Sequence, residues 1–393
     1  MKAAIRSFNF LGVFIFCMIF INAAKAQLDT IPASDNKAFL INSKTLNEQR
    51  SIWVHLPEGY YATTQTYPTL YLLDGEGHFR YVSELVDYLS SYDRNRIPQM
   101  IVVAILNIDR TRDFTPIHSL LFGGKVDSTL MRTTGGGAKF LQFIQTEVVP
   151  FVDSNFRVQP YRILAAHSLG GTFGAYAKEA APNLFKSMIL MSPAIYGGNS
   201  EILRRFKPFL QRHQNLSGKI FISIGNENMQ TVDTLISQIK MYAPKTLAWQ
   251  FRQYKEENHF SVTYKSMYDA LKFIYQDWFI DNYDTTKLSY KDIELHFARL
   301  SREFGYTIYP TEELMNNAGY KQLNTGNIDA AIEIFRKNLI NFPNSWNAFD
   351  SMGEAYLKKG EKRLAIKNYE RSITLNPNNE AGKKILTELK NEK

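Results

Sequence analysis

The sequence predicts an α/β protein with a mostly parallel central sheet, followed by a small all-α region built from repeats. Two observations support this prediction. From about Phe39 to Phe279, short apolar runs alternate with longer amphipathic stretches, and several runs are apolar throughout, as in strands buried on both faces of a parallel sheet. Beyond that point, small and aromatic residues recur at one fixed spacing. With 393 residues, the chain is long enough for two or three domains.

Composition narrows the classes of protein that fit this chain. Hydrophobic residues make up 45% and charged residues 21% of the sequence, so the chain can bury a large core and is not disordered. The formal net charge is +8. The positive residues form no dense block with interleaved aromatic residues, so nucleic acid is a poor candidate for a partner.

The first 26 residues are expected to be a secretory signal peptide. Lys2 and Arg6 precede the apolar run Phe8–Ile21, and the small residues of Ala24–Ala26 favour cleavage directly after them. An uncleaved membrane anchor is the alternative, but the run is short for a bilayer core of about 30 Å. Cleavage would remove Cys17, the only cysteine, so no disulfide and no catalytic thiol are expected. No lipid anchor is expected either, because Phe16 stands before Cys17, where a lipobox needs a small residue. The mature protein is expected in the periplasm or outside the cell.

Residues 27–280 are expected to form the α/β domain. Seven short apolar runs are predicted to be strands, namely Ser51–Leu56, Thr69–Leu73, Ile101–Leu106, Ile163–Ala166, Ser187–Met191, Lys219–Ile224 and Ala248–Tyr254. Longer stretches with helical periodicity are predicted to be helices, namely Tyr81–Ser90, Ala138–Asp153, Gly171–Ala180, Glu201–Gln211, Val232–Tyr242 and Ser261–Trp278.

Residues 312–393 are expected to hold two tetratricopeptide repeats. Five residue pairs lie 34 positions apart, which is the length of this helix–turn–helix unit: Gly319 and Gly353, Gly326 and Gly360, Ala331 and Ala365, Phe335 and Tyr369, Pro343 and Pro377. The small residues would let two helices approach, and the aromatic residues would fill the gap between them. Because three units are usually needed for stability, we expect packing on the preceding helix, Lys291–Phe304, or on the α/β domain. The polar stretch Asp281–Tyr290 is the expected linker, so residues 281–311 hold a linker and a helix.

The strongest local signal is the segment ILAAHSLGG at positions 163–171. An apolar strand runs into a tight turn at Ser168 and then into a helical pattern, which is the context of the nucleophile elbow in an α/β-hydrolase fold. Such a turn lifts the serine hydroxyl above the sheet edge, and Gly170 and Gly171 would let the helix pack closely. Ala166 stands where the G-x-S-x-G pattern has its first glycine. The alternative is a serine that only caps a helix.

A serine nucleophile needs a general base, and three histidines follow Ser168. His213 lies in the charged end of a predicted helix, and His296 lies in an amphipathic helix. His259 follows the last predicted strand and opens the next helix, where a base would lie over the serine. We therefore expect His259 to be the base, and the alternative is a loop histidine without a catalytic role.

The expected acid is Glu227, just past the strand Lys219–Ile224, at the edge where functional groups of open α/β sheets collect. It would hold the tautomer of the base and stabilise the imidazolium. The rivals are Asp233, which is expected inside the next helix, and Glu256 and Glu257, which are close to the base in sequence.

An oxyanion also needs hydrogen-bond donors. One is expected to be the backbone N–H of Leu169, directly after the nucleophile. The other is expected to be the backbone N–H of Glu76, with Gly75 permitting a sharp turn after an early strand. An ordinary strand-to-helix loop is the alternative.

Arg110 and Arg112 follow another strand at the same edge, where they could bind a carboxylate of a substrate. The favoured interpretation is structural, with Arg112 and Asp113 pairing to hold the loop. Gly135–Gly137 lacks the Lys-Ser or Lys-Thr of a phosphate loop, and no histidines and acids have the spacing of a metal site. No cofactor and no metal are expected.

Five segments together resemble the Putative esterase family, which includes esterase D-like and enterochelin esterase-like enzymes. They are LLDGEGHF (72–79), NIDRTRDFTP (107–116), YRILAAHSLGG (161–171), GNEN (225–228) and NHFSV (258–262). The resemblance covers about Ser51 to Trp278. It implies a carboxylic-ester hydrolase with a triad of Ser168, Glu227 and His259, and oxyanion donors at Leu169 and Glu76.

The sequence therefore predicts an exported serine esterase that forms an acyl-enzyme on a small-molecule ester. One alternative is an acyltransferase, in which an alcohol replaces water. Another is a non-catalytic binding module, in which the repeats bind a protein partner and the hydrolase fold is an inert scaffold.

Overall fold

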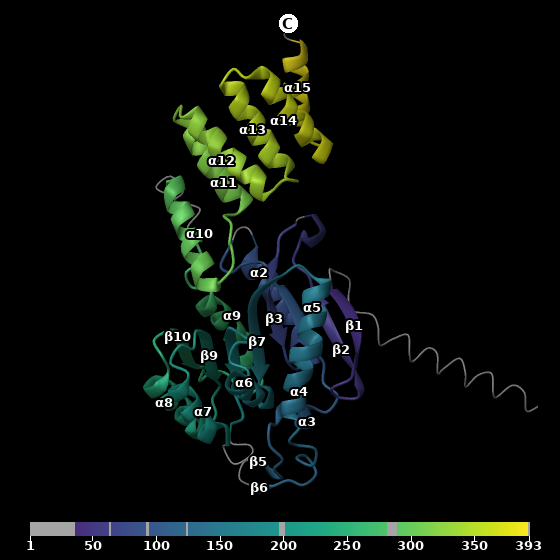
Figure 1. The fold of residues 1–393 in the computed structure, drawn as a ribbon, viewed down its shortest axis with the longest axis vertical. Coiled ribbons are helices and arrows are strands. Elements are labelled where there is room, and N and C mark those ends of the chain that lie inside the picture. The colour runs from purple at the N-terminus through teal and green to yellow at the C-terminus, as the bar shows by residue number, and fades with distance from the viewer. Residues whose placement is uncertain are drawn as a thin grey trace, which may run out of the picture.

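The computed structural model describes residues 36–62, 64–91, 94–122, 125–195, 201–280 and 289–391. The expected signal peptide with Cys17, and residues 281–288 of the expected linker, lie outside these ranges. No helix within them combines the length and the apolar character needed to cross a membrane. The sheet lies at one end of the molecule and the C-terminal helices at the other (Figure 1).

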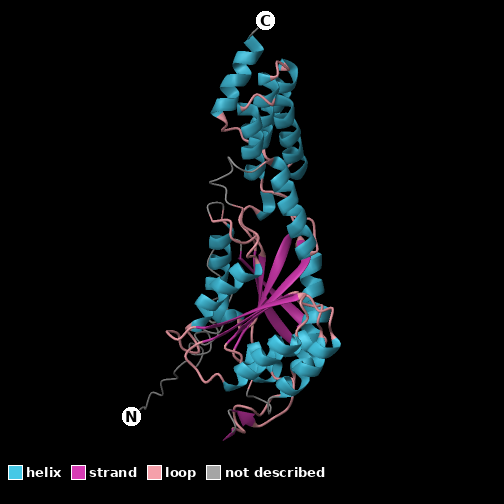
Figure 2. Ribbon diagram, turned by 90° about the vertical axis from the view of Figure 1, so that its left-hand side faces the viewer, coloured by secondary structure: helices cyan, strands magenta, loops and turns pink. Residues whose placement is uncertain are grey.

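Eight strands form one twisted sheet in the order β1-β2-β4-β3-β7-β8-β9-β10, with helices on both faces (Figure 2). The strands are β1 (Asn36–Ser43), β2 (Glu48–His55), β3 (Tyr67–Leu72), β4 (Ile101–Ile105), β7 (Val158–His167), β8 (Ser187–Met191), β9 (Gly218–Ile224) and β10 (Leu247–Gln253). From β4 to β10, neighbouring strands are parallel. β2 pairs antiparallel with both of its neighbours, β1 and β4. This architecture confirms the predicted fold class and all seven predicted strands. The edge strand β1 and the short hairpin of β5 (Leu121–Phe122) and β6 (Lys125–Val126) were not predicted.

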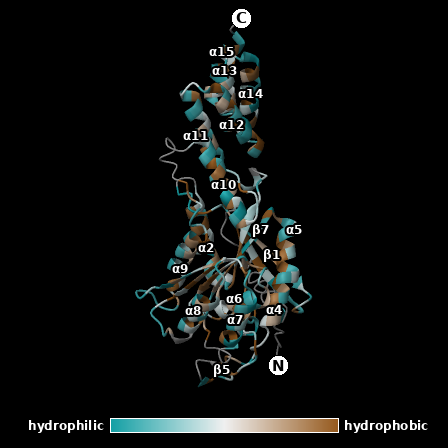
Figure 3. Ribbon diagram, turned by 60° about the vertical axis from the view of Figure 1, so that its left-hand side comes forward, coloured by the Kyte–Doolittle hydropathy of each residue, from teal (hydrophilic) through white to brown (hydrophobic). Residues whose placement is uncertain are grey.

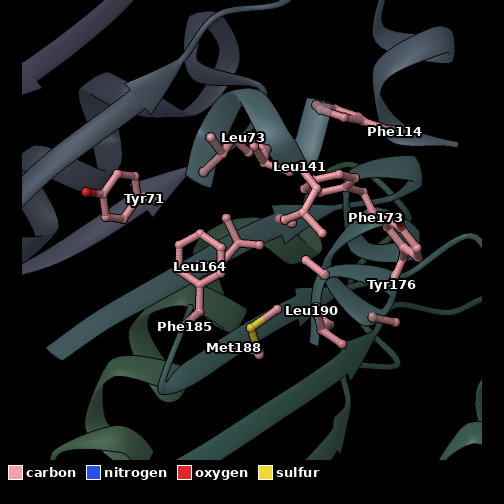
Figure 4. Packing of buried hydrophobic residues seen from close by; sticks show 14 of the residues in the cluster. Tyr71, Leu73, Phe114, Leu141, Leu164, Phe173, Tyr176, Phe185, Met188 and Leu190 are labelled. Carbon is pink, nitrogen blue, oxygen red and sulfur yellow. The ribbon is translucent and has the colours of Figure 1, made fainter. Parts of the chain in front are cut away.

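Alternate residues of each central strand pack into one of two cores, as a sheet buried on both faces requires. Leu164 and Ala166 of β7 belong to the first core, which Figure 4 shows in part, and Ile163 and Ala165 belong to the second. The first is covered by α4 (Gly137–Phe143), α5 (Val149–Asn155), α6 (Leu169–Ala180), α7 (Glu201–Arg212) and α8 (Gln230–Tyr242). The second is covered by α2 (Gly75–Ser90) and α9 (Val262–Ile274). The central strands accordingly carry the hydrophobic segments coloured brown in Figure 3.

The helical predictions differ most from the structure in three places. The helix expected over Tyr81–Ser90 begins six residues earlier, at Gly75. The single helix expected over 138–153 is interrupted by a π-helical turn, Ile144–Val148, just before Pro150, which has no N–H to donate. A five-residue helix, α3 (Arg110–Phe114), was not predicted.

The C-terminal region consists of helix pairs at the predicted period. They are α11 (Glu312–Asn324) with α12 (Ile328–Asn341), and α13 (Trp346–Lys358) with α14 (Lys362–Leu375). A Cβ added to Gly319 would lie 2.4 Å from the ring of Phe335, and one added to Gly353 would lie 3.0 Å from the ring of Tyr369. The aromatic residues therefore fill the gap between paired helices as predicted. A further helix, α15 (Glu380–Asn391), packs on α14 and extends the array by half a unit.

The helix α10 (Tyr290–Phe304) joins the two regions through a shared core. The Phe304 ring stacks on Tyr275 with centroids 5.0 Å apart, and Leu314 of α11 belongs to the same cluster. The Lys219 ammonium forms an ion pair of 2.6 Å with Glu303. The repeats thus pack on the preceding helix, α10, and share a core with the α/β domain, which are the two partners that were expected.

Candidate active site

Ser168 occupies a sharp turn between β7 and α6. Its φ of 58° and ψ of −120° lie outside the ordinary regions for a non-glycine residue. The turn is held by backbone hydrogen bonds, because the Ser168 N–H donates to the Met191 carbonyl at 3.0 Å and its carbonyl accepts from the Ala194 N–H at 3.0 Å. The Ser168 hydroxyl makes no capping hydrogen bond to α6, which disfavours the interpretation as a helix cap.

The start of α6 lies very close to the turn that follows β8. A Cβ on Gly171 would lie 2.8 Å from the Cβ of Pro193, so only glycine fits here, as predicted. A Cβ on Gly170 would be 3.5 Å from its nearest neighbours, an ordinary contact, so close packing does not require this second glycine.

The structure brings together the three side chains that the sequence selected. The His259 Nε2 lies 2.9 Å from the Ser168 Oγ, and the His259 Nδ1 lies 2.6 Å from the Glu227 Oε2. The His259 and Glu227 side chains are about one quarter exposed, so the site is open to a ligand. A hydroxyl, an imidazole and a carboxylate in this order can transfer a proton away from the serine oxygen.

The rival residues have other partners. The His213 Nδ1 lies 2.9 Å from the Phe209 carbonyl, and the His296 Nε2 lies 3.2 Å from the Trp278 carbonyl. Asp233 lies in α8, and Glu256 and Glu257 both pair with Lys265.

The loops that carry the base and the acid pack directly on each other. They follow β10 and β9, two neighbouring parallel strands, so both leave the sheet at the same edge as Ser168. The Asn226 N–H donates to the Glu257 carbonyl at 2.7 Å, and a Cβ on Gly225 would lie 2.7 Å from that oxygen. Glycine at 225 thus permits the close approach that places Glu227 beside His259.

Ser192 holds the second oxygen of the acid and was not predicted. Its hydroxyl donates to the Glu227 Oε1 at 2.7 Å. Ser192 follows β8, between the strands of the serine and the acid, and its φ is 40°. A serine directly after the predicted strand Ser187–Met191 was the available signal, but a strand end alone does not identify its partner.

His167 was also missed, although it precedes Ser168. Its Nε2 lies 2.7 Å from the backbone carbonyl of His259, and the two rings have centroids 4.8 Å apart. Because a carbonyl only accepts hydrogen bonds, the Nε2 carries the hydrogen. Burial lowers the pKa of His167 to about 4, so the ring is neutral near pH 7. This hydrogen bond fixes the backbone that carries His259.

The neutral, buried His167 predicts a pH-dependent loss of stability. Its pKa rises from about 4 in the folded protein to its ordinary 6.5 in the unfolded chain. Between these values the unfolded chain binds a proton that the folded chain does not, so the free energy of unfolding falls as the pH drops from 6.5 towards 4. The full loss is about 3 kcal/mol. His167→Gln keeps an N–H donor but does not titrate, so urea unfolding of both proteins should show their difference in stability shrinking at low pH. A difference independent of pH would contradict this prediction.

The two expected oxyanion donors lie at the ends of adjacent strands. Leu169 opens α6 directly after Ser168, and Glu76 lies in the first turn of α2 after β3. The sharp turn is made by Asp74, at φ 54°, and not by Gly75 as predicted. Gly75 is needed for packing, because its Cβ would lie 2.9 Å from the Ala104 Cβ. Aspartate tolerates this conformation, and the Asp74 carboxylate is held by Asn107 and Arg110.

The two arginines proposed as substrate ligands are engaged within the protein. Arg110 donates from Nε and Nη2 to the Asp74 carboxylate, and Nη2 also donates to the His167 carbonyl at 3.2 Å. Arg112 donates from all three guanidinium nitrogens, to Glu48 and Asp113. The hydrogen bonds that Arg112 donates to Glu48 in turn raise the pKa of Arg112. The geometry favours the structural interpretation, because a substrate carboxylate would have to displace these carboxylates.

A small cavity lies at the first turn of α6, which directly follows Ser168 in the chain, although Ser168 is not in its wall. It measures about 20 Å³ and is lined by Leu169 and Thr172 of α6 together with Thr115, Pro116, Ile117, Ser119, Met131, Thr134, Glu201 and Ile202. It has room for little more than one water-sized group. Across the described ranges, no cluster of three or more His, Cys, Asp or Glu side chains is arranged to hold a metal ion.

Comparison with known proteins gives the following similarities. The family model described as Putative esterase matches residues 43–274, and a tetratricopeptide repeat model matches residues 347–379. The apo-salmochelin esterase of Escherichia coli O6:H1 is 27% identical over 163 residues, which cover 39% of this chain and 49% of that protein. This chain spans about half the length of the curated relatives it matches.

Two solved structures extend the comparison. An IroE-like serine hydrolase from Shewanella oneidensis is similar at a TM-score of 0.66 and 27% identity, over 74% of this chain and 95% of that chain. A protein from Capnocytophaga ochracea, at 15% identity and a TM-score of 0.60, covers 90% of this chain and 99% of its own. This second similarity concerns the fold alone, and it includes most of the helical C-terminal region.

Proposed function

This chain belongs to the Putative esterase family, and we propose that it is a carboxylic-ester hydrolase whose nucleophile, base and acid are Ser168, His259 and Glu227. The observation that carries the proposal is the pair of hydrogen bonds that joins the Ser168 hydroxyl to His259 and His259 to Glu227. These residues lie far apart in the sequence, and they follow three different strands, β7, β9 and β10, at the same edge of the sheet.

The proposed reaction has two halves. The Ser168 Oγ attacks the ester carbonyl while the His259 Nε2 takes the hydroxyl proton, and Glu227 holds the Nδ1–H and stabilises the imidazolium. The Leu169 and Glu76 backbone N–H groups would stabilise the oxyanion. The intermediate then expels the alcohol, which receives the proton from His259, and leaves an acyl-enzyme. A water molecule, deprotonated by His259, attacks the acyl carbonyl and releases the acid and the free serine.

The cavity beside Leu169 supports a preference for short acyl groups. An acyl carbonyl bound at the Leu169 N–H would direct its chain along the first turn of α6, where Leu169 and Thr172 line the cavity. A volume of about 20 Å³ accepts a methyl group more readily than a long chain. We therefore expect acetyl esters to be better substrates than octanoyl esters. The relative named as an apo-salmochelin esterase makes siderophore esters the second class to test.

We also propose that the chain is exported and that its repeats bind a protein partner. The apolar run and the cleavage site within residues 1–26 support export. The match to a tetratricopeptide repeat supports a role of the C-terminal helices in binding another protein.

Hydrolysis of 4-nitrophenyl acetate, followed by stopped flow, tests the esterase proposal. An acyl-enzyme predicts an initial burst of nitrophenolate close to the enzyme concentration. Acetyl, octanoyl, feruloyl and catecholate siderophore esters then define the substrate class. Added alcohol acceptors separate hydrolysis from acyl transfer, because a transferase would form the new ester in place of the free acid. Failure to turn over any of these esters would overturn the proposal.

A further inference from the structure

A cleft lies between the α/β part and the repeats, at the sheet edge opposite Ser168. Two cavities of about 610 and 220 Å³ share Thr64, Gln65, Asn341 and Phe342 in their walls, so they adjoin each other. We call the two together the interdomain cleft. It runs from the start of β3, past the loop between α10 and α11, to the start of α13. The ten residues of β7 separate it from Ser168 by roughly 30 Å, so it is not part of the candidate active site.

The walls of the interdomain cleft are polar and almost uncharged. Glu312 is the only charged residue among the described residues that line it, although 21% of the chain is charged. Side-chain amides are frequent, namely Gln65, Asn95, Gln99, Gln159, Asn341, Asn344 and Asn347. The amides of Gln65, Asn341 and Asn344 make no hydrogen bond to any other described residue. Each of them therefore offers two donors and an acceptor to a ligand.

Aromatic rings line the same cleft. Tyr309 is 59% exposed and lines the larger cavity, Trp346 is 39% exposed and lines the smaller one, and Phe342 lines both. Trp278 and Tyr306 also line the larger cavity. Aromatic side chains together with unpaired amides match the two kinds of surface that a sugar presents, because a pyranose has an apolar C–H face and a rim of hydroxyl groups.

The part of the wall formed by Trp278 and Asn95 is held in place by contacts within the protein. The Trp278 Nε1–H donates to the Asn95 Oδ1 at 3.2 Å, and the Trp278 ring meets Tyr275 edge to face with centroids 5.9 Å apart. Asn95 keeps a φ of 43°, a conformation that asparagine tolerates better than most residues. A wall that is already ordered loses little conformational freedom when it binds a ligand.

We propose that the interdomain cleft binds a neutral oligosaccharide chain and thereby holds the catalytic part near a polysaccharide. Its volume suits a ligand of several sugar units. The scarcity of charge argues against an acidic glycan or a charged peptide, which would enter the cleft without a counter-charge. The role of holding the catalytic part near a polysaccharide rests on the proposed esterase activity, whereas binding at the cleft requires neither Ser168 nor His259 and is tested separately.

Isothermal titration of the full-length protein with cellohexaose, xylohexaose and mannohexaose tests the inference. We expect measurable binding of at least one neutral hexasaccharide and none of hexagalacturonate. The double variant Tyr309→Ala/Trp346→Ala should weaken that binding at least tenfold. Both side chains are exposed, so the variant should fold, which its thermal midpoint checks.

The matched control is Tyr264→Ala, which removes an aromatic residue that is 56% exposed on α9, outside the cleft. It should leave the affinity unchanged, and Ser168→Ala should also bind normally. The inference is overturned if no neutral hexasaccharide binds, if the double variant binds as well as the unmodified protein, or if Tyr264→Ala weakens binding equally. Preferential binding of an uncharged peptide such as hexa-asparagine would also overturn it.

Discussion

Replacing Ser168 with alanine should lower kcat for 4-nitrophenyl acetate by about 10⁴- to 10⁶-fold, with KM changed only severalfold. Alanine cannot form the acyl-enzyme, so only the background stabilisation by the oxyanion donors would remain. The fold should survive, because the turn is held by backbone hydrogen bonds that alanine also makes. Steady-state kinetics and the thermal midpoint of the variant measure the two effects separately.

Ser192→Ala is the matched serine variant. It removes one hydrogen bond to the Glu227 carboxylate and leaves the nucleophile and base in place. A hydrogen bond to a charged group corresponds to a loss of roughly tenfold to a hundredfold in kcat. If Ser168→Ala kept several per cent of the activity, or lost no more than Ser192→Ala, Ser168 would not be the nucleophile.

Replacing Arg50 with methionine should lower the free energy of unfolding by about 3–5 kcal/mol. The Arg50 side chain is fully buried, and its Nη1 donates to the Asp113 Oδ2 at 2.7 Å. The Asp113 side chain is 1% exposed, so removal of the arginine leaves a buried carboxylate with Arg112 as its remaining cation. Arg50 also donates to the Leu106 carbonyl at the end of β4. The stability difference can be measured by urea unfolding followed by circular dichroism.

Arg80→Met provides the comparison for this second prediction. The Arg80 side chain is 85% exposed and pairs with Glu84 one turn further along α2. An exposed pair of this kind contributes about 0.3–0.5 kcal/mol. Equal effects of the two arginine variants would contradict the importance of the buried ion pair.

The sequence predicted the parts of the fold whose apolar pattern is unambiguous. β7, β8 and β9 are buried on both faces, so they appear as continuous apolar runs. β1 was not predicted because it is a half-exposed edge strand, and α3 was not predicted because five residues are too few to show a helical period. α15 begins 34 residues after Trp346, so the repeat pattern could have revealed it.

The positions of Ser168, Glu227 and His259 could be predicted because parallel strands place their following loops at one edge of the sheet. The supporting contacts could not be predicted in this way. The partner of His167 is a backbone carbonyl 92 residues away, and the partner of Ser192 lies 35 residues away. Such pairs depend on the final approach of two loops, for which no periodic pattern exists in the sequence.

The measurement that tests the central proposal most directly is labelling by a fluorophosphonate probe, followed by mass spectrometry of the intact protein and its peptides. One adduct per chain, located on Ser168, absent from Ser168→Ala and strongly slowed in His259→Gln, is the predicted result. A folded protein that takes no adduct, or that carries it on another residue, would contradict the proposed nucleophile and base.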